Sequence, residues 1–222
     1  MLAPELKKVA YDPTRYMDIE NVEEAVNIIL CPTEGLTAEQ RWADEAPALM
    51  CIIERYIEPQ SRVLDYGCGI GRLAKPLIEK LRCSVVGVDI SPNMRALATS
   101  LVDSPRFFAL DPVMFDAIVP ETTFDAAIAI WTLQHCIDLA TAIARIHNTM
   151  KTGGRLVILN NRTRCVPVEG GEWADDGQNV EQMIYDVGFN ELMRGQLDES
   201  VAPGWMQEGT FWAVYEKVCM SR

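Results

Sequence analysis

The feature that most constrains this chain is a glycine-rich turn at residues 67–71. Residues 62–66 before it form a short apolar segment bounded by turn residues, which predicts a buried β-strand. Leu73, Leu77 and Leu81 after it recur at helical spacing. Glycines between a strand and a helix allow positive φ and the close approach of a ligand, and the helix N-terminus offers free N–H groups. The turn therefore predicts a site for a ligand that carries an anionic group.

The spacing of the glycines narrows the choice of ligand. The run is Gly67-x-Gly69-x-Gly71, whereas a dinucleotide fingerprint needs G-x-G-x-x-G. Arg72 occupies the place of that third glycine. A P-loop would end its glycine run with Lys-Ser or Lys-Thr, and this run does not. The turn thus differs from both common phosphate-binding loops.

A second predicted strand, at residues 84–90, places an acid close to this turn. Asp89 lies about twenty residues after the glycines, where a nucleoside-binding βαβ unit places a carboxylate on the ribose hydroxyls. The alternative is that Asp89 only caps the helix that begins near Pro92. Ser91 is the better cap because Pro92 then occupies the first helical position. The ribose role is therefore the preferred interpretation.

Asp65 stands two residues before the first glycine, and the pattern D-x-G-x-G-x-G resembles motif I of the class I S-adenosylmethionine (SAM)-dependent methyltransferases. Residues 85–94 resemble motif II of that family. Residues 124–135 resemble motif IV, in which the strand end lies beside the sulfonium. The resemblance implies SAM as cofactor and S-adenosylhomocysteine as product. The cofactor-binding residues that it implies are Asp65, Gly67, Cys68, Gly69, Arg72, Asp89, Ile90, Met94, Asp111, Ile130 and Trp131.

The alternation of strand and helix patterns predicts an α/β fold. We expect an open, doubly wound, mostly parallel seven-stranded sheet with helices on both faces and an antiparallel C-terminal strand. Residues 1–60 are expected to form an N-terminal helical cap, and residues 61–222 a Rossmann-like core. Residues 160–177 are expected to be irregular. The remaining strands are predicted at 106–110, 123–131, 153–159, 191–197 and 210–218, and helices at 21–30, 37–56, 138–150 and 181–187.

Composition excludes some function classes. The net charge of −12 disfavours a nucleic-acid partner, since so acidic a surface repels phosphate backbones. No apolar run is long enough to span a membrane, and the first residues lack the apolar core of a secretory signal. The seven cysteines are odd in number and form no C-x-x-C pair, so neither zinc nor disulfides are indicated. We expect reduced thiols and a cytoplasmic location. The sequence does not indicate an oligomeric state.

His135 is the candidate catalytic residue, because it follows the strand that the resemblance places beside the methyl group. Its intrinsic pKa suits a general base. The alternative is a structural or cofactor-packing role. His147 lies within a predicted amphipathic helix and is expected to be a surface or packing residue.

Two further regions contain candidate substrate contacts. The family's N-terminal helices cover the cofactor site as a lid, which makes aromatic residues there candidates for contacts with the substrate or SAM. Two arginines after the fifth predicted strand suit recognition of an anionic group such as a carboxylate. The alternatives are a packing role for the aromatic side chains and ordinary solvated ion pairs for the arginines. The candidates are Tyr11, Tyr16, Arg162, Arg164 and Trp173, with Arg41 and Trp42 as further lid contacts.

The residues that follow the fourth predicted strand bear on the reaction. Trp131-Thr-Leu-Gln replaces the Pro-Pro-Tyr signature of nucleic-acid amino-methylating enzymes, and the Pro-Cys nucleophile and the acidic metal cluster of other subfamilies are missing. We therefore expect metal-free, in-line methyl transfer to an oxygen or nitrogen of a small molecule. The alternatives are a methyltransferase for a peptide or protein side chain, a nicotinamide-dependent oxidoreductase, and a SAM-binding protein without activity.

Overall fold

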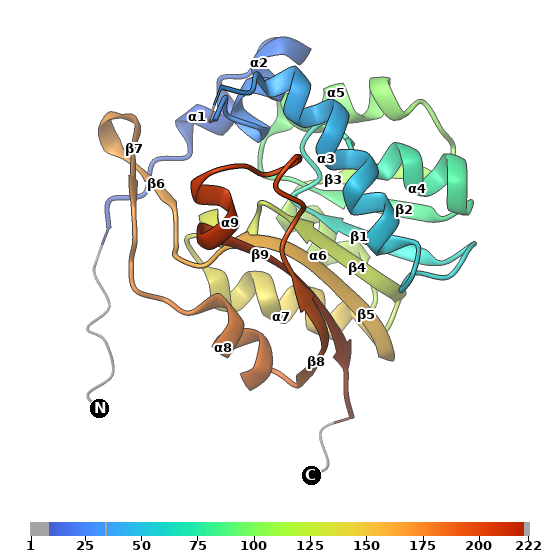
Figure 1. Ribbon diagram of the computed structural model, residues 1–222. Helices are drawn as coiled ribbons and strands as arrows, with labels where there is room; N and C mark the ends of the chain where they lie inside the picture. Colours follow the sequence, from blue (N-terminus) through green and yellow to red (C-terminus); the bar gives the residue numbers. More distant parts are fainter. Residues whose placement is uncertain (1–8, 34, 220–222) are drawn as a thin grey trace, which may run out of the picture.

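The computed structural model describes residues 9–33 and 35–219, and its centre is a seven-stranded sheet (Figure 1). The strand order is β3-β2-β1-β4-β5-β9-β8. The glycine turn follows the central strand β1, whose neighbours are β2 and β4. The strands are β1 (Arg62–Tyr66), β2 (Ser84–Val88), β3 (Phe107–Leu110), β4 (Phe124–Ile130), β5 (Met150–Asn161), β8 (Phe189–Gly195) and β9 (Thr210–Lys217).

The sheet is mostly parallel, as the sequence predicts. Strands β1 to β5 pair in parallel, whereas β9 pairs antiparallel with both β5 and β8. All the parallel strands therefore end at one edge of the sheet. Ligands of open α/β sheets bind outside this edge, near the point where the strand order reverses. Here the reversal lies between β1 and β4, directly beside the glycine turn.

Helices cover both faces of the sheet, so successive residues of its central strands are buried on opposite sides. Val63 of β1 packs in one core with the helices of one face, and Leu64 packs in a second core with those of the other. The first core includes α3 (Ala38–Ile53), α4 (Ala74–Leu81), α5 (Pro92–Val102) and α9 (Trp205–Gly209), and the second includes α6 (Pro112–Ile118), α7 (Leu139–Thr149) and α8 (Val180–Asp186).

The N-terminal region divides into two parts. The helices α1 (Thr14–Met17) and α2 (Val22–Ile29) lie at the carboxyl edge of the sheet, where Ile19 and Ala25 pack against Ile70 and Met94. Helix α3 instead packs on a sheet face through Leu49, among others. It begins with the capping box that the sequence predicts, in which the Thr37 side chain and Gln40 exchange hydrogen bonds. The lid is therefore formed by α1 and α2.

Three elements depart from the sequence-based expectation. Helix α6 begins directly after β3, where the predictions from the sequence include no helix. Proline at the first helical position and the Asp111 cap explain this helix. The segment expected to be irregular contains a hairpin of β6 (Val166–Val168) and β7 (Glu172–Ala174), joined by the 3-10 turn η2 (Glu169–Gly171). A second 3-10 turn, η1 (Leu133–His135), follows β4.

The described ranges contain neither a membrane-spanning helix nor a metal-binding cluster. No helix within residues 9–33 and 35–219 is long and apolar enough to cross a membrane. Over the same ranges, no group of three or more His, Cys, Asp and Glu side chains could hold a metal ion.

Candidate active site

The glycine turn joins the ends of β1 and β2. The N–H groups of Gly67 and Cys68 both donate to the carbonyl oxygen of Val88, at 2.7 and 3.0 Å. Gly67 has φ +78°, and a Cβ there would lie 2.1 Å from Oγ1 of Thr132. Only glycine fits this position, because both the backbone conformation and the neighbouring threonine exclude a side chain.

Asp89 occupies the end of β2 in an orientation set by the backbone. Its Oδ2 accepts a hydrogen bond from the Gly69 N–H, and its Oδ1 accepts one from the Ser91 N–H, each at 2.9 Å. Ser91 caps α5 through the N–H of Met94, so Asp89 is free of the capping role. Burial raises the pKa of Asp89, while these two N–H groups oppose that effect. An ionised carboxylate held by two donors still has lone pairs for two hydroxyl groups.

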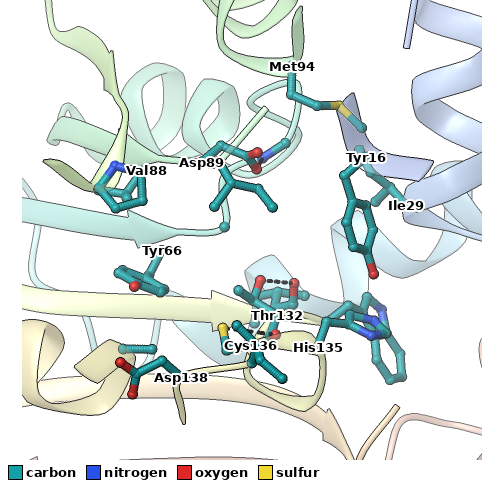
Figure 2. A pocket seen from close by; sticks show the side chains of 18 of the residues that line it. Tyr16, Ile29, Tyr66, Val88, Asp89, Met94, Thr132, His135, Cys136 and Asp138 are labelled. Atoms are coloured by element: carbon teal, nitrogen blue, oxygen red, sulfur yellow. Dashed lines mark hydrogen bonds between the residues drawn. The ribbon is translucent and has the colours of Figure 1, made fainter. Parts of the chain in front are cut away.

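A cavity of about 240 Å³ lies at this edge of the sheet (Figure 2). Asp89 forms part of its wall, beside the glycine turn and the residues after β4. In Figure 2, Tyr16 and His135 lie together at one side, and Tyr66 and Asp138 lie at the other. The lining residues are Tyr11, Tyr16, Ile28, Ile29, Tyr66, Gly67, Gly69, Val88, Asp89, Ile90, Met94, Pro112, Ile130, Trp131, Thr132, His135, Cys136, Ile137, Asp138, Ala142 and Arg145.

The lid is tied down at two places. A Cβ on Gly69 would lie 2.8 Å from Cδ1 of Ile29, so α2 rests directly on the glycine turn. Tyr11 forms a β-bridge with Val168 of the β6–β7 hairpin, and the Asp12 N–H donates to the carbonyl oxygen of Pro167 at 3.0 Å. The lid is therefore held over the cavity by the glycine turn and by the β6–β7 hairpin.

Glu45, on α3, is the centre of a buried hydrogen-bond network that includes Trp131 of the cavity wall. Its side chain is fully buried and accepts hydrogen bonds from Arg41 at 3.2 Å and from Arg72 at 2.8 Å. It also accepts one from Nε1 of Trp131 at 2.8 Å. Trp131 has φ +56°, a strained value for a non-glycine residue, and its side chain lines the cavity. The network fixes the orientation of this ring.

His135 uses both ring nitrogens within the protein. Its Nδ1 lies 2.5 Å from the carbonyl oxygen of Cys165, so Nδ1 carries the proton and donates. Its Nε2 lies 3.2 Å from the amide nitrogen of Gln134 and accepts from it. Burial lowers the pKa of His135 to about 4, and the charge of Arg164 contributes to the same shift. The imidazole is therefore neutral at pH 7.

Comparison with known proteins agrees with this geometry. Residues 64–158 match the protein family described as a methyltransferase domain. The chain is 29% identical over 151 residues to phosphoethanolamine N-methyltransferase 3 of Arabidopsis thaliana, covering 62% of this chain and 30% of that protein. It is 33% identical over 177 residues to a Synechocystis 2-methyl-6-phytyl-1,4-hydroquinone methyltransferase, covering 70% and 55%. The family match therefore supports the class I SAM-dependent methyltransferase domain that the sequence motifs indicate.

A solved structure shows the same fold. Phosphoethanolamine N-methyltransferase 2 of Haemonchus contortus, in complex with SAM, superposes with a TM-score of 0.60 at 17% identity. The superposition covers 91% of this chain and 61% of that one. The chain also spans only 30% and 55% of the lengths of the Arabidopsis and Synechocystis relatives. The similarity is thus to part of larger proteins, and the solved structure shows a shared fold.

The class I motifs bring most of the residues that they imply to one cavity. Gly67, Gly69 and Asp89 line it, as do Ile90, Met94, Ile130 and Trp131. Four others lie elsewhere. Asp65 is buried within β1, and burial raises its pKa to about 7. Cys68 points at Gly87 in the core, Arg72 joins the Glu45 network, and Asp111 caps α6.

Some of the candidate substrate residues lie at the cavity, and others do not. Tyr11 and Tyr16 line the cavity, and the ring of Trp173 lies 4.9 Å from that of His135. Trp42 and Arg41 pack beside the Glu45 network, and neither lines the cavity. The expectation for the two arginines after β5 is not met at this cavity. Arg162 is exposed and donates to the carbonyl oxygen of Glu208, while Arg164 is fully buried in an ion pair with Asp176.

The sequence reasoning missed one wall of the cavity. Asp138, Ala142 and Arg145 line it from the N-terminal part of α7, and Arg145 also donates to the Tyr66 hydroxyl at 3.4 Å. Their spacing of four and three residues places them on one helix face. That spacing was a usable signal, since α7 follows the strand of motif IV. Thr132 and Cys136 also line the cavity, but no pattern in the sequence indicated that they would.

Proposed function

We propose that the chain binds SAM in this cavity and transfers its methyl group to an oxygen or nitrogen of a small molecule. The observation that carries the proposal is the Asp89 carboxylate, which lines the cavity while the N–H groups of Gly69 and Ser91 hold its orientation. Two vicinal ribose hydroxyls are the natural donors to such a carboxylate. Ile90 and Pro112 flank the place of the base.

The methionine part of SAM carries a carboxylate, and the Glu45 network supplies charge for it. Arg41 and Arg72 share the single carboxylate of Glu45. Nε of Arg41 and Nη1 of Arg72 are buried and have no hydrogen-bond partner within residues 9–33 and 35–219. Trp131 lies between this network and the cavity, since its Nε1 donates to Glu45. We propose that the positive charges of these two guanidinium groups attract the methionine carboxylate of SAM to the part of the cavity beside Trp131.

The proposed reaction is an in-line displacement. When bound, SAM would supply an activated methyl group on a sulfonium. The acceptor's lone pair would form a bond to that methyl carbon as the S–CH3 bond breaks, without help from a metal, and S-adenosylhomocysteine would leave. The chain's residues enclose the cavity and hold the two reactants, and such positioning supplies much of the rate of a bimolecular reaction. Ile29 and Tyr16 of the lid exclude water from the site.

His135 is proposed to act as a neutral wall of the site instead of a general base. Its Nδ1–H donates to Cys165, and the lone pair of Nε2 already accepts from Gln134. A pKa of about 4 makes it a weak base at neutral pH. The acceptor therefore has to arrive with a free lone pair, as a carboxylate or an unprotonated amine does. A phenol would need its proton removed elsewhere.

A small molecule is favoured over a peptide because the cavity is covered. Ile29 presses on the glycine turn, and Tyr11 pairs with the β6–β7 hairpin. A protein substrate would need an open groove. The relatives' names are consistent with this choice, since they specify phosphoethanolamine and a hydroquinone.

Calorimetric titration with SAM, S-adenosylhomocysteine and NADH tests the cofactor directly. We expect both adenosyl ligands to bind and NADH not to bind. Binding of NADH alone would overturn the proposal, because the glycine turn would then serve a dinucleotide. A second measurement follows transfer of labelled methyl from SAM to phosphoethanolamine and to hydroquinones. Tight SAM binding without transfer to any small acceptor would favour the inactive or peptide-directed alternatives.

A further inference from the structure

Arg15 of the lid has buried nitrogens that lack hydrogen-bond partners. Its Nε and Nη1 are inaccessible to solvent, and neither has a partner among residues 9–33 and 35–219. In the same ranges no carboxylate lies within 4.0 Å of this guanidinium, whose Cζ lies 4.3 Å from the ring centroid of Trp173. The hydroxyl of the next residue, Tyr16, is also buried and unpartnered there. Consecutive lid residues thus present several donors without an acceptor.

Arg15 is half-buried, and the fully buried Arg164 shows how the same chain pairs an arginine whose nitrogens are removed from solvent. Its Nε and Nη2 donate to the two oxygens of Asp176 at 3.0 and 3.1 Å. Its remaining donors go to the carbonyl oxygens of Leu133 and Cys136. A buried guanidinium without such partners is costly, because its charge loses hydration and gains nothing in return. The contrast indicates that the partner of Arg15 is not part of the described chain.

Tyr16 lines the Tyr16–His135 side of the cavity, whereas Arg15 is not a lining residue and lies behind this wall, with its guanidinium over the Trp173 ring. The hydroxyphenyl ring of Tyr16 lines the cavity and lies 6.0 Å from the His135 ring and 6.4 Å from the Trp173 ring. The charge of Arg15 is the smallest of the causes that lower the pKa of His135, after burial and the charge of Arg164. Figure 2 places Tyr16 and His135 together, away from Tyr66 and Asp138. The Arg15 charge thus lies close to this end of the cavity on a chain of net charge −12.

We propose that Arg15 and Tyr16 bind an oxyanion of the methyl acceptor, a carboxylate or a phosphate. The proposal rests on the proposed function, which it extends from a small molecule to an anionic small molecule. Guanidinium groups bind oxyanions through charge-assisted hydrogen bonds, and the tyrosine hydroxyl adds one more donor. The role that the sequence suggested for Arg162 and Arg164 thus passes to an arginine of the lid. Binding of the oxyanion would also hold the lid over the reacting atoms.

The test titrates the full chain, loaded with S-adenosylhomocysteine, with inorganic phosphate and with acetate at constant ionic strength. We expect at least one probe to bind saturably. Arg15→Gln should weaken that binding by about tenfold or more, and Tyr16→Phe by about threefold. Arg15→Lys should retain part of it, because the charge remains. Arg162→Gln is the matched control, since it removes the same charge from an exposed site, and it should leave binding unchanged.

The outcomes separate the alternatives. Saturable binding of phosphate alone identifies a phosphate-bearing acceptor, and binding of acetate alone identifies a carboxylate-bearing one. Absence of saturable binding, or equal binding by Arg15→Gln and the wild type, overturns the proposal. So does a loss of S-adenosylhomocysteine affinity in Arg15→Gln with unchanged oxyanion binding, because Arg15 would then hold the cofactor. Failure of the wild type itself to bind S-adenosylhomocysteine counts against the proposed function, and that result is obtained before any probe is added.

Discussion

The two ends of the cavity are built in different ways. At the Asp89 end, the wall comes from one continuous stretch that includes Gly67, Gly69 and Asp89, and backbone N–H groups orient the functional carboxylate. At the Tyr16 end, the wall combines the lid with His135, and the ring of Trp173 from the hairpin packs behind them. The first end depends on local chain geometry, whereas the second depends on contacts between segments far apart in the sequence.

This difference matches the tasks that we propose for the two ends. A cofactor shared by a whole family can be bound by a fixed turn and a fixed acid. An acceptor that differs between members needs a wall whose residues can change without disturbing that turn. The lid and the β6–β7 hairpin meet these needs, since both lie outside the seven-stranded sheet. Changes at the Asp89 end should therefore affect SAM, and changes at the Tyr16 end should affect the acceptor.

The largest effect is expected at the Glu45 network, behind the Trp131 wall that neither end includes. Glu45→Ala leaves the charges of Arg41 and Arg72 buried without a carboxylate, and such a loss typically costs about 3–5 kcal/mol. Urea unfolding at pH 7 measures it. Glu54→Ala is the control, because its pair with Lys80 is exposed and should contribute less than about 1 kcal/mol. Equal losses of unfolding free energy in the two variants would contradict the prediction.

The second prediction concerns His135, at the Tyr16 end, and the loss of folding stability at acidic pH. The folded-state pKa of His135 is about 4, below its ordinary value of 6.5, so the unfolded chain binds its proton first as the pH falls. Stability should therefore decline from about pH 6.5 towards pH 4, with a contribution from this residue of about 2–3 kcal/mol. His135→Gln should remove that part of the decline. Unfolding curves at pH 7 and pH 4.5 measure it, and parallel pH profiles of variant and wild type would contradict it.

Asp89 tests the cofactor end. Asp89→Asn removes the charge that would accept from the ribose hydroxyls, and SAM binding should weaken by about 1–3 kcal/mol. Asp138→Asn is the control, since Asp138 also lines the cavity but lies beside Tyr66 and caps α7. Asparagine keeps its capping bond to the Thr141 N–H. Equal weakening by both variants would indicate a general charge effect and would contradict the ribose assignment.

The sequence predicted the sheet, its antiparallel last strand and most of the Asp89 end. These features depend on patterns within a few tens of residues: alternating buried strands, helix caps and the spacing of glycines. Ser91 and Thr37 cap their helices as their positions indicate. The outer boundaries of several elements differ by a few residues, because tertiary contacts decide where strands stop pairing.

The Tyr16 end could be predicted only in part. Tyr11, Tyr16 and His135 were identified from their positions along the chain, and they do line the cavity. The sequence could not show that Arg164 would meet Asp176, or that Arg15 would lie over Trp173 without an acceptor. Whether a buried arginine is paired depends on the folding of separate segments onto one another. The sequence correctly suggested an arginine for an anion, but placed it after β5.

The smallest expected effect again concerns the cofactor end, at Asp111. The class I resemblance places an acid after the third strand on the adenine amino group, yet here Oδ1 of Asp111 accepts from the N–H groups of Val113 and Met114, at 2.9 Å each. Asp111 also lies outside the cavity lining, although Pro112 is part of it. Asp111→Asn keeps the cap, so SAM affinity should fall by less than about 1 kcal/mol. A loss as large as that of Asp89→Asn, measured in the same titration, would mean that Oδ2 binds the adenine and that the cofactor end extends to β3.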